Sequence, residues 1–235
     1  MEHQNNGLYS QDHVCRPGGL ALTGRLAARV SLHPGASLVD VGCGLGESLL
    51  WLSHEFDFRL TGIEENEAKA EEARQYIAGR EPRHRISILS SEGGRLPLPE
   101  RSADAILMEC SFSRMEEPYL LIADCRRALV PGGCVLLSDM YAREQETELE
   151  EPFGRLDSAE TLRGRWEAAG FEIREWEDHS AVLGDYLAQI LMNEPDDPLA
   201  HSLCSQRAAL KEAGCGYYTA VLAKPYHLLM EESLW

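Results

Sequence analysis

The chain has 235 residues, of which 44% are hydrophobic and 26% are charged. These proportions are typical of a folded globular domain, so they exclude wholesale disorder and the fibrous classes of protein. The formal net charge of −17 argues against a nucleic-acid partner, because binding to phosphates requires a basic surface.

Residues 1–34 predict a polar, irregular start and then a short helix that leads into the core. Beyond them, short apolar runs alternate with helical patterns as far as residue 141. The apolar runs, which predict buried strands, are 37–44, 58–64, 85–91, 103–110 and 134–141. The helical patterns between them are 47–56, 66–79 and 119–130. This alternation predicts a parallel sheet with helices on both faces.

The last third of the chain has a different pattern. After an acidic loop over 144–152, the sequence predicts a helix over 157–170, with Asp157 or Ser158 as its N-cap and Gly170 as its end. The remaining predicted elements are a sixth strand at 171–178, helical stretches at about 181–193 and 200–213, and a seventh strand at 216–225. The predicted fold is therefore α/β: a Rossmann-like, seven-stranded, mostly parallel sheet with a helical insertion near the C-terminus, in a single domain over 1–235.

The pattern of cysteines and the lack of a long apolar segment indicate the cellular compartment of the protein. The seven cysteines are widely spaced and form no CxxC pair, so we expect free thiols and no metal site. The first residues are polar and lack the pattern of a signal peptide, and no apolar run approaches the roughly 18 residues of a membrane span. We therefore expect a cytoplasmic protein in a reducing compartment, without membrane insertion.

A glycine-rich turn joins the first predicted strand to the helix that follows it. Its sequence is Asp40-Val41-Gly42-Cys43-Gly44-Leu45-Gly46. Because glycine has no Cβ, a ligand can lie against this backbone, and open α/β sheets bind ligands at the carboxyl ends of their strands. The residue after Gly46 is Glu47, which departs from the G-x-G-x-x-G dinucleotide pattern and would repel a pyrophosphate. Asp40 suits instead a ligand with an ammonium group.

An acidic residue closes the second predicted strand. Glu64 follows the glycine turn by roughly 20 residues, which is the spacing of a carboxylate that accepts hydrogen bonds from both hydroxyls of a ribose. A surface carboxylate at a strand end is the alternative for Glu64, and Glu65 next to it suits a solvated position equally well. The turn and Glu64 together predict a site for a nucleoside-containing ligand.

The order of four segments resembles the motifs of class I S-adenosylmethionine (SAM)-dependent methyltransferases over roughly residues 35 to 140. These segments are LVDVGCGLGESLLWL, GIEEN, SEGGRLPLPERSADAILMEC and RRALVPGGCVLLSD. The resemblance implies that SAM is the cofactor, with its methionine part on the glycine turn, its ribose on Glu64 and its adenine face near Glu65. The implied cofactor-binding residues are Asp40, Gly42, Cys43, Gly44, Gly46, Glu64, Glu65, Glu92, Gly93 and Glu109.

One longer segment, MECSFSRMEEPYLLIADCRRALVPGGCVLLSD, is similar to the arsenite and ubiquinone-type small-molecule methyltransferases. This resemblance implies a small acceptor such as a thiol, an arsenic or selenium centre, or a quinol-type carbon or oxygen. Thiolates are the preferred ligands of soft ions, so four cysteines are candidates for binding As(III): Cys15, Cys110, Cys204 and Cys215. Buried free cysteine is the alternative that we favour, because unpaired cysteine is among the most buried residue types.

The candidate catalytic residues lie at or near predicted strand ends, and they are Glu109, Cys110, Asp139 and His13. Methyl transfer from a sulfonium is a displacement on an activated carbon, so a soft acceptor needs no base, whereas an oxygen or nitrogen acceptor more often does. The sequence does not choose among the four, because polar residues at strand ends often cap helices or face water. The segment 141–215 is the predicted substrate-covering region, in which aromatic side chains line a pocket or pack in the core.

Two other functions remain open at this point. The first is a non-catalytic SAM-binding or assembly module, which the cofactor motifs do not exclude. The second is a nicotinamide-dependent oxidoreductase on a similar sheet, which Glu47 and the glycine spacing disfavour. The identity of the acceptor and the oligomeric state do not follow from the sequence.

Overall fold

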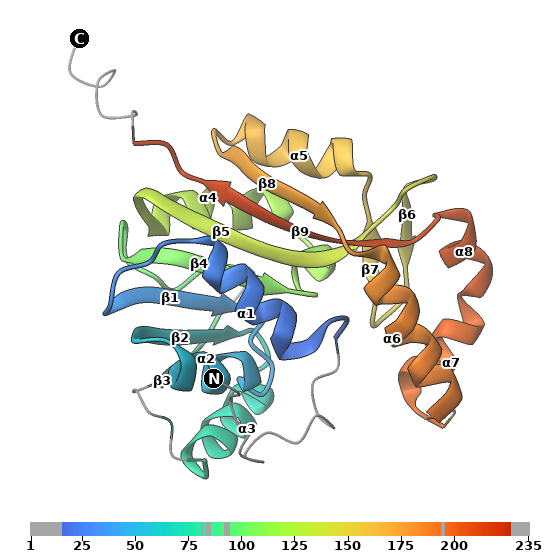
Figure 1. Cartoon of the computed structure of the whole chain (residues 1–235), viewed down its shortest axis with the longest axis horizontal. Coiled ribbons are helices and arrows are strands. Elements are labelled where there is room, and N and C mark those ends of the chain that lie inside the picture. Colours follow the sequence, from blue (N-terminus) through green and yellow to red (C-terminus); the bar gives the residue numbers. More distant parts are fainter. Residues whose placement is uncertain (1–15, 81, 83–85, 92–94, 194–195, 227–235) are drawn as a thin grey trace, which may run out of the picture.

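A seven-stranded sheet forms the centre of the computed structural model (Figure 1), in the strand order β3-β2-β1-β4-β5-β9-β8. The structure describes residues 16–80, 82, 86–91, 95–193 and 196–226. The strands of the sheet are β1 (Ala36–Val41), β2 (Phe58–Glu64), β3 (Ile86–Ser90), β4 (Ala103–Glu109), β5 (Leu129–Tyr141), β8 (Glu172–Asp178) and β9 (Gly216–Ala223). This architecture confirms the predicted Rossmann-like α/β fold.

The strands from β3 to β5 are parallel, and β9 runs antiparallel to both of its neighbours, β5 and β8. The order of the parallel strands reverses between β1 and β4, which pair directly. Ligands of open α/β sheets bind beyond the carboxyl ends of the strands at such a reversal. The fold therefore directs attention to the residues that follow β1 and β4.

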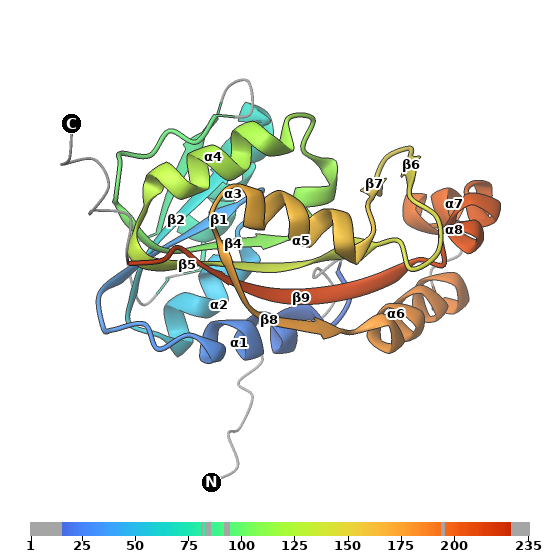
Figure 2. The same cartoon turned by 90° about the horizontal axis from the view of Figure 1, so that it is seen from above.

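Helices cover both faces of the sheet, as Figure 2 shows. The helices are α1 (Gly19–Arg29), α2 (Glu47–Glu55), α3 (Glu67–Ala78), α4 (Pro118–Ala128), α5 (Ala159–Ala168), α6 (Ser180–Asn193), α7 (Pro198–Ser205) and α8 (Arg207–Glu212), with a short 3-10 helix η2 (Phe112–Arg114). The apolar faces of α1 and α2 are buried on one side of the sheet and those of α4 and α5 on the other. Trp166 of α5 is 1% exposed and packs against Phe112 and Phe171.

A separate group of elements lies beyond the carboxyl ends of the parallel strands (Figure 1). It consists of α6, α7, α8 and a hairpin of two short strands, β6 (Thr147–Leu149) and β7 (Gly154–Leu156). Its elements share one apolar cluster, which includes Leu149 and Leu156 from the hairpin, Ile190 from α6 and Leu203 from α7. This group is the counterpart of the predicted helical insertion.

The local predictions were wrong at three places. The acidic loop at 144–152 contains β6 and the start of a hairpin. The helical stretch at 200–213 is broken at Gln206, whose side chain accepts from the backbone N–H of Glu150 and donates to its carbonyl oxygen. β5 begins before residue 134, because Leu129 already pairs with Ala103 ahead of a bulge in the register.

The sequence predicts two candidates for the N-cap of α5, and the structure assigns it to Ser158. Its Oγ accepts from the backbone N–H of Thr161 at 3.1 Å, whereas Asp157 pairs with Arg155 and Arg165. The organisation of residues 1–235 as one domain stays a prediction. Among the helices of the described residues, none has both the length and the apolar character that crossing a bilayer requires.

Candidate functional site

Three positions of the glycine turn after β1 have a left-handed backbone conformation, which glycine adopts without strain. Gly42, Gly44 and Gly46 have φ angles of 78°, 52° and 79°. A Cβ on Gly42 would lie 2.6 Å from the Cβ of Ser111, whereas a Cβ on Gly44 would meet nothing within 4 Å. The backbone N–H groups of Gly42 and Cys43 both donate to the carbonyl oxygen of Ile63, at 2.8 and 3.1 Å. The turn is thus fixed to β2 and leaves open space beside Gly44.

Cys43 contributes to this turn through its backbone, because its side chain packs inward. Its Sγ lies 2.6 Å from the position that a Cβ on Gly62 of β2 would occupy. Burial, followed by the nearby Asp40 carboxyl group, raises the pKa of the Cys43 thiol well above its usual value. Cys43 is therefore a neutral packing residue rather than a thiolate.

Glu64 ends β2 and reaches the glycine turn. Its Oε2 accepts from the backbone N–H of Gly44 at 3.2 Å, and its Oε1 accepts from the N–H of Asn66 at 3.2 Å. The carboxylate is thereby held against the turn at Gly44, and its role as the ribose contact stays a prediction. Glu65 is exposed. Glu92 and Gly93, the other predicted contacts of the base, lie outside the described residues.

Two buried carboxyl groups lie at the ends of β1 and β4. Asp40 is 3% exposed, and the side chain of Glu109 is 5% exposed. Burial, followed by the proximity of Glu109, raises the pKa of Asp40 to about 8. The Asp40 carboxyl group of the ligand-free protein is therefore protonated at neutral pH, and a cationic ligand group placed beside it would stabilise its ionised form.

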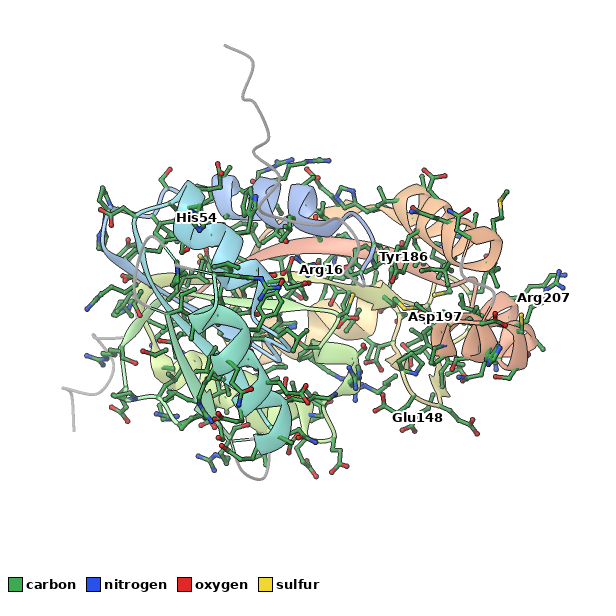
Figure 3. All side chains as sticks on the ribbon, turned by 90° about the horizontal axis from the view of Figure 1, so that it is seen from below. Arg16, His54, Glu148, Tyr186, Asp197 and Arg207 are labelled. Carbon is green, nitrogen blue, oxygen red and sulfur yellow. The ribbon has the colours of Figure 1, made fainter. Side chains whose placement is uncertain are left out.

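Glu109 is bound by partners from three other segments. Thr23 of α1 donates to its Oε1 at 2.7 Å, Ser48 of α2 donates to its Oε2 at 2.6 Å, and the guanidinium of Arg16 lies 3.2 Å from Oε2. In Figure 3, Arg16 lies near the middle of the molecule, whereas Arg207 of α8 lies at its right-hand end. Arg16 is a residue of the site that the sequence analysis missed, because no periodicity or motif marks it.

Cys110 follows Glu109 and has a φ angle of 51°, a left-handed conformation that is uncommon for a residue with a side chain. Its Sγ lies 3.2 Å from the phenolic oxygen of Tyr217 in β9. Burial, followed by the charge of Asp139, raises the pKa of the Cys110 thiol to about 12. A thiol of this kind is neutral at physiological pH and is not a nucleophile.

Asp139 of β5 holds the chain that follows β4. Its carboxylate accepts from the N–H and the Oγ–H of Ser113, both at 2.9 Å, and from the N–H of Met140 at 2.8 Å. These bonds attach η2 to β5 and occupy the carboxylate with structural partners. His13, the remaining candidate base, lies outside the described residues.

Of the cysteines that were candidates for a soft-ion site, two lie beside the same apolar cluster and one is exposed. Cys204 is exposed on α7, whereas Cys110 and Cys215 are partly buried beside an apolar cluster of Leu22, Leu183 and Tyr217. Cys15 lies outside the described residues. Among residues that are described, no group of three or more His, Cys, Asp or Glu side chains is placed to hold a metal ion.

Comparisons with known proteins find similarity to methyltransferases. Residues 39–137 match the family described as "Methyltransferase domain". The chain is 29% identical over 165 residues to 27-O-demethylrifamycin SV methyltransferase of Amycolatopsis mediterranei (strain S699), a match that covers 69% of this chain and 58% of the relative. The chain spans between 58% and 62% of the length of the first three curated relatives that it matches.

Solved structures show the same fold. The structure of the cyclase SpnF has a TM-score of 0.73 and 29% identity, with 88% of this chain and 80% of that chain covered. Phosphoethanolamine N-methyltransferase 2 of Haemonchus contortus, in complex with S-adenosyl-L-methionine, has a TM-score of 0.73 at 17% identity, with 93% and 55% covered. These structures show the fold, and the family match over residues 39–137 together with the curated relatives supports the class that the sequence analysis predicted, the class I SAM-dependent methyltransferases.

Proposed function

We propose that this chain, which carries a class I methyltransferase domain, transfers the methyl group of SAM to a small-molecule acceptor. The observation that supports this best is the meeting of three features at the carboxyl ends of β1, β2 and β4. They are a glycine turn with open space at Gly44, the Glu64 carboxylate bonded to that turn, and the buried pair of Asp40 and Glu109.

The residues of this site fit the cofactor by the chemistry of their donors and acceptors. Asp40 and Glu109 suit the ammonium of the methionine part, the backbone around Gly44 allows close approach, and Glu64 suits the two ribose hydroxyls. When bound, SAM supplies a methyl group that is already activated for displacement. The task of the protein is therefore to hold donor and acceptor in line and to exclude water.

We take the apolar cluster that packs against Cys110, at the end of β4, as the acceptor side of the site. Leu22, Leu183 and Tyr217 form a buried cluster against which Cys110 and Met140 pack. Of the two carboxylates that the sequence analysis proposed as bases, Asp139 is occupied by Ser113 and Met140. The other, Glu109, is bound by Thr23, Ser48 and Arg16. Such surroundings favour an acceptor that needs no dedicated base, such as a thiol or an arsenic or selenium centre.

Product formation tests the proposal directly. The full chain is incubated with methyl-labelled SAM and, in separate reactions, with alkyl thiols, arsenite, selenite and quinols, and both products are identified by mass spectrometry. We expect S-adenosylhomocysteine together with a labelled acceptor from one of these classes. Tight binding of S-adenosylhomocysteine without labelled product from any acceptor would overturn methyl transfer.

A second candidate function is use of the SAM site without methyl transfer. It is favoured by two relatives with names other than methyltransferase: the cyclase SpnF at 29% identity, and carboxy-S-adenosyl-L-methionine synthase of Pseudomonas putida at 30% identity over 135 residues. In this case the fold would bind SAM and promote another reaction or an assembly. Labelled SAM recovered intact after substrate turnover distinguishes this function from the first.

The ribose role predicted for Glu64 is testable by substitution. Glu64→Gln is expected to weaken the binding of S-adenosylhomocysteine about tenfold to a hundredfold, because hydrogen bonds to a charged group are each worth roughly 1.5–3 kcal/mol. Calorimetric titration measures the change. Glu72→Gln, on the exposed side of α3, is the matched control and should bind as the original chain does. Equal affinity of all three proteins would remove Glu64 from the site.

A further inference from the structure

Arg16 directs its side chain into the protein, although arginine side chains are mostly exposed. It lies just before α1, and its side chain is only 13% exposed. One guanidinium nitrogen, Nη2, donates to the hydroxyl oxygens of Thr23 at 2.7 Å and Ser48 at 2.9 Å and lies 3.2 Å from Oε2 of Glu109. Arg16 therefore joins α1, α2 and the end of β4 at the site described above.

The two hydroxyl groups fix the orientation of the guanidinium. Thr23 accepts from Arg16 and donates to Oε1 of Glu109, and Ser48 accepts from Arg16 and donates to Oε2. Each hydroxyl thus links the cation to the carboxylate, in addition to their direct contact. A guanidinium held from one side in this way presents its remaining N–H groups in a fixed direction.

Part of the guanidinium has no partner. The Nε of Arg16 is buried and makes no hydrogen bond with any described residue. A buried N–H without an acceptor is costly, so its presence at a candidate ligand site indicates an acceptor that arrives with the ligand. The charges of the cluster agree, because two carboxyl groups and one guanidinium complement a ligand that carries both an ammonium and a carboxylate.

We propose that Arg16 binds the carboxylate of the amino-acid end of the ligand, while Asp40 and Glu109 bind its ammonium. Thr23 and Ser48 are positioning residues that hold the guanidinium. The inference rests on the proposed use of SAM and deepens it. It assigns the selectivity for a free carboxylate to one side chain. That side chain precedes the part of the chain, residues 39–137, that matches the methyltransferase domain. The segment just before α1 is then part of the ligand site.

The test compares two ligands that differ only in the carboxylate. S-Adenosylhomocysteine carries ammonium and carboxylate, and S-adenosyl-3-thiopropylamine carries the ammonium alone. The affinity of each is measured by calorimetry for the original chain and for Arg16→Gln. We expect the original chain to prefer S-adenosylhomocysteine about tenfold to a hundredfold, as for a charge-assisted pair. Arg16→Gln should reduce this preference to near unity by weakening only the ligand with the carboxylate.

The ligand without a carboxylate gives the sharper readout. Removing Arg16 leaves two carboxyl groups without a neighbouring cation, so the amine should bind the variant as tightly as the original chain or more tightly. Arg16→Lys keeps the charge without the planar fork and should lie between the two. Arg25→Gln, in the helix α1 that follows Arg16, is the control, because Arg25 has a 59% exposed side chain on the surface beside Glu177.

The outcomes separate this inference from the proposed function. Failure of the original chain to bind either ligand would contradict the SAM site itself. The original chain could instead bind tightly while Arg16→Gln loses affinity for both ligands equally. An unchanged ratio of the two affinities would then show that Arg16 only supports the structure. If Arg16→Gln does not fold, the ratio for Arg16→Lys decides, and an unchanged preference there with both affinities reduced overturns the inference.

Discussion

Replacing Asp40 by asparagine is expected to abolish the binding of S-adenosylhomocysteine and, at the same time, to raise the melting temperature of the ligand-free protein at about pH 8. Asparagine has the shape of a protonated aspartate, so the turn after β1 keeps its packing. The ammonium of the ligand would lose its carboxylate partner, for which we expect at least a hundredfold weaker binding, as when a buried charge is left unpaired. Calorimetric titration measures this loss.

The effect on stability follows from the direction of the pKa change. Burial and Glu109 raise the pKa of Asp40 from 3.8 to about 8, so the folded chain holds this proton more tightly than the unfolded chain. The resulting contribution to stability is fully present below the unfolded pKa and is lost as pH rises toward the folded pKa. The melting temperature of the ligand-free chain should therefore fall over this range, and Asp40→Asn should reduce the fall.

Melting curves between pH 4 and pH 9 for the two proteins test the stability effect, with Asp185→Asn, an exposed position on α6, as the control. A parallel fall in both melting temperatures would mean that Asp40 is already ionised in the free protein. Binding of S-adenosylhomocysteine by Asp40→Asn at the original affinity would place the ligand elsewhere. The two measurements are independent, because one is made without ligand.

Most of the sheet could be predicted from sequence because β1, β2, β4, β5 and β9 are largely buried apolar runs. β2 covers the predicted range 58–64, and β9 begins at the predicted Gly216. The hairpin of β6 and β7 could not be predicted, because its strands are three residues long and lie in an acidic segment. Its stability depends on tertiary contacts, through Leu149 and Leu156, with helices that come later in the chain.

The candidate site divides in the same way. Asp40, the glycine turn and Glu64 could be predicted because their spacing along one strand-turn-helix-strand unit is itself the signal. Arg16 could not, because its role depends on Ser48, 32 residues away, and on Glu109, which Thr23 contacts across 86 residues. The end of β5 shows the reverse, since the sequence places Asp139 near the site but only the fold shows that Ser113 occupies its carboxylate.

Binding of S-adenosylhomocysteine at pH 7 is expected to release about one proton per molecule bound, because a carboxyl group with a pKa of about 8 must ionise to pair with the ammonium of the ligand. The affinity should then rise with pH by up to about tenfold per unit below pH 8 and level off above it. Calorimetry in buffers with different heats of ionisation counts the protons.

5′-Methylthioadenosine is the matched control ligand, because it retains the nucleoside and the sulfur but lacks the amino-acid end. Its binding should release no proton from Asp40 and should depend little on pH, since no cation arrives beside the carboxyl group. Proton release by this ligand as well would trace the effect to another group of the pocket, and proton uptake with S-adenosylhomocysteine would contradict a protonated Asp40. The difference between the two ligands thus measures the charge that the end of β1 acquires on binding, which is the electrostatic basis for selecting an amino acid over an uncharged thioether.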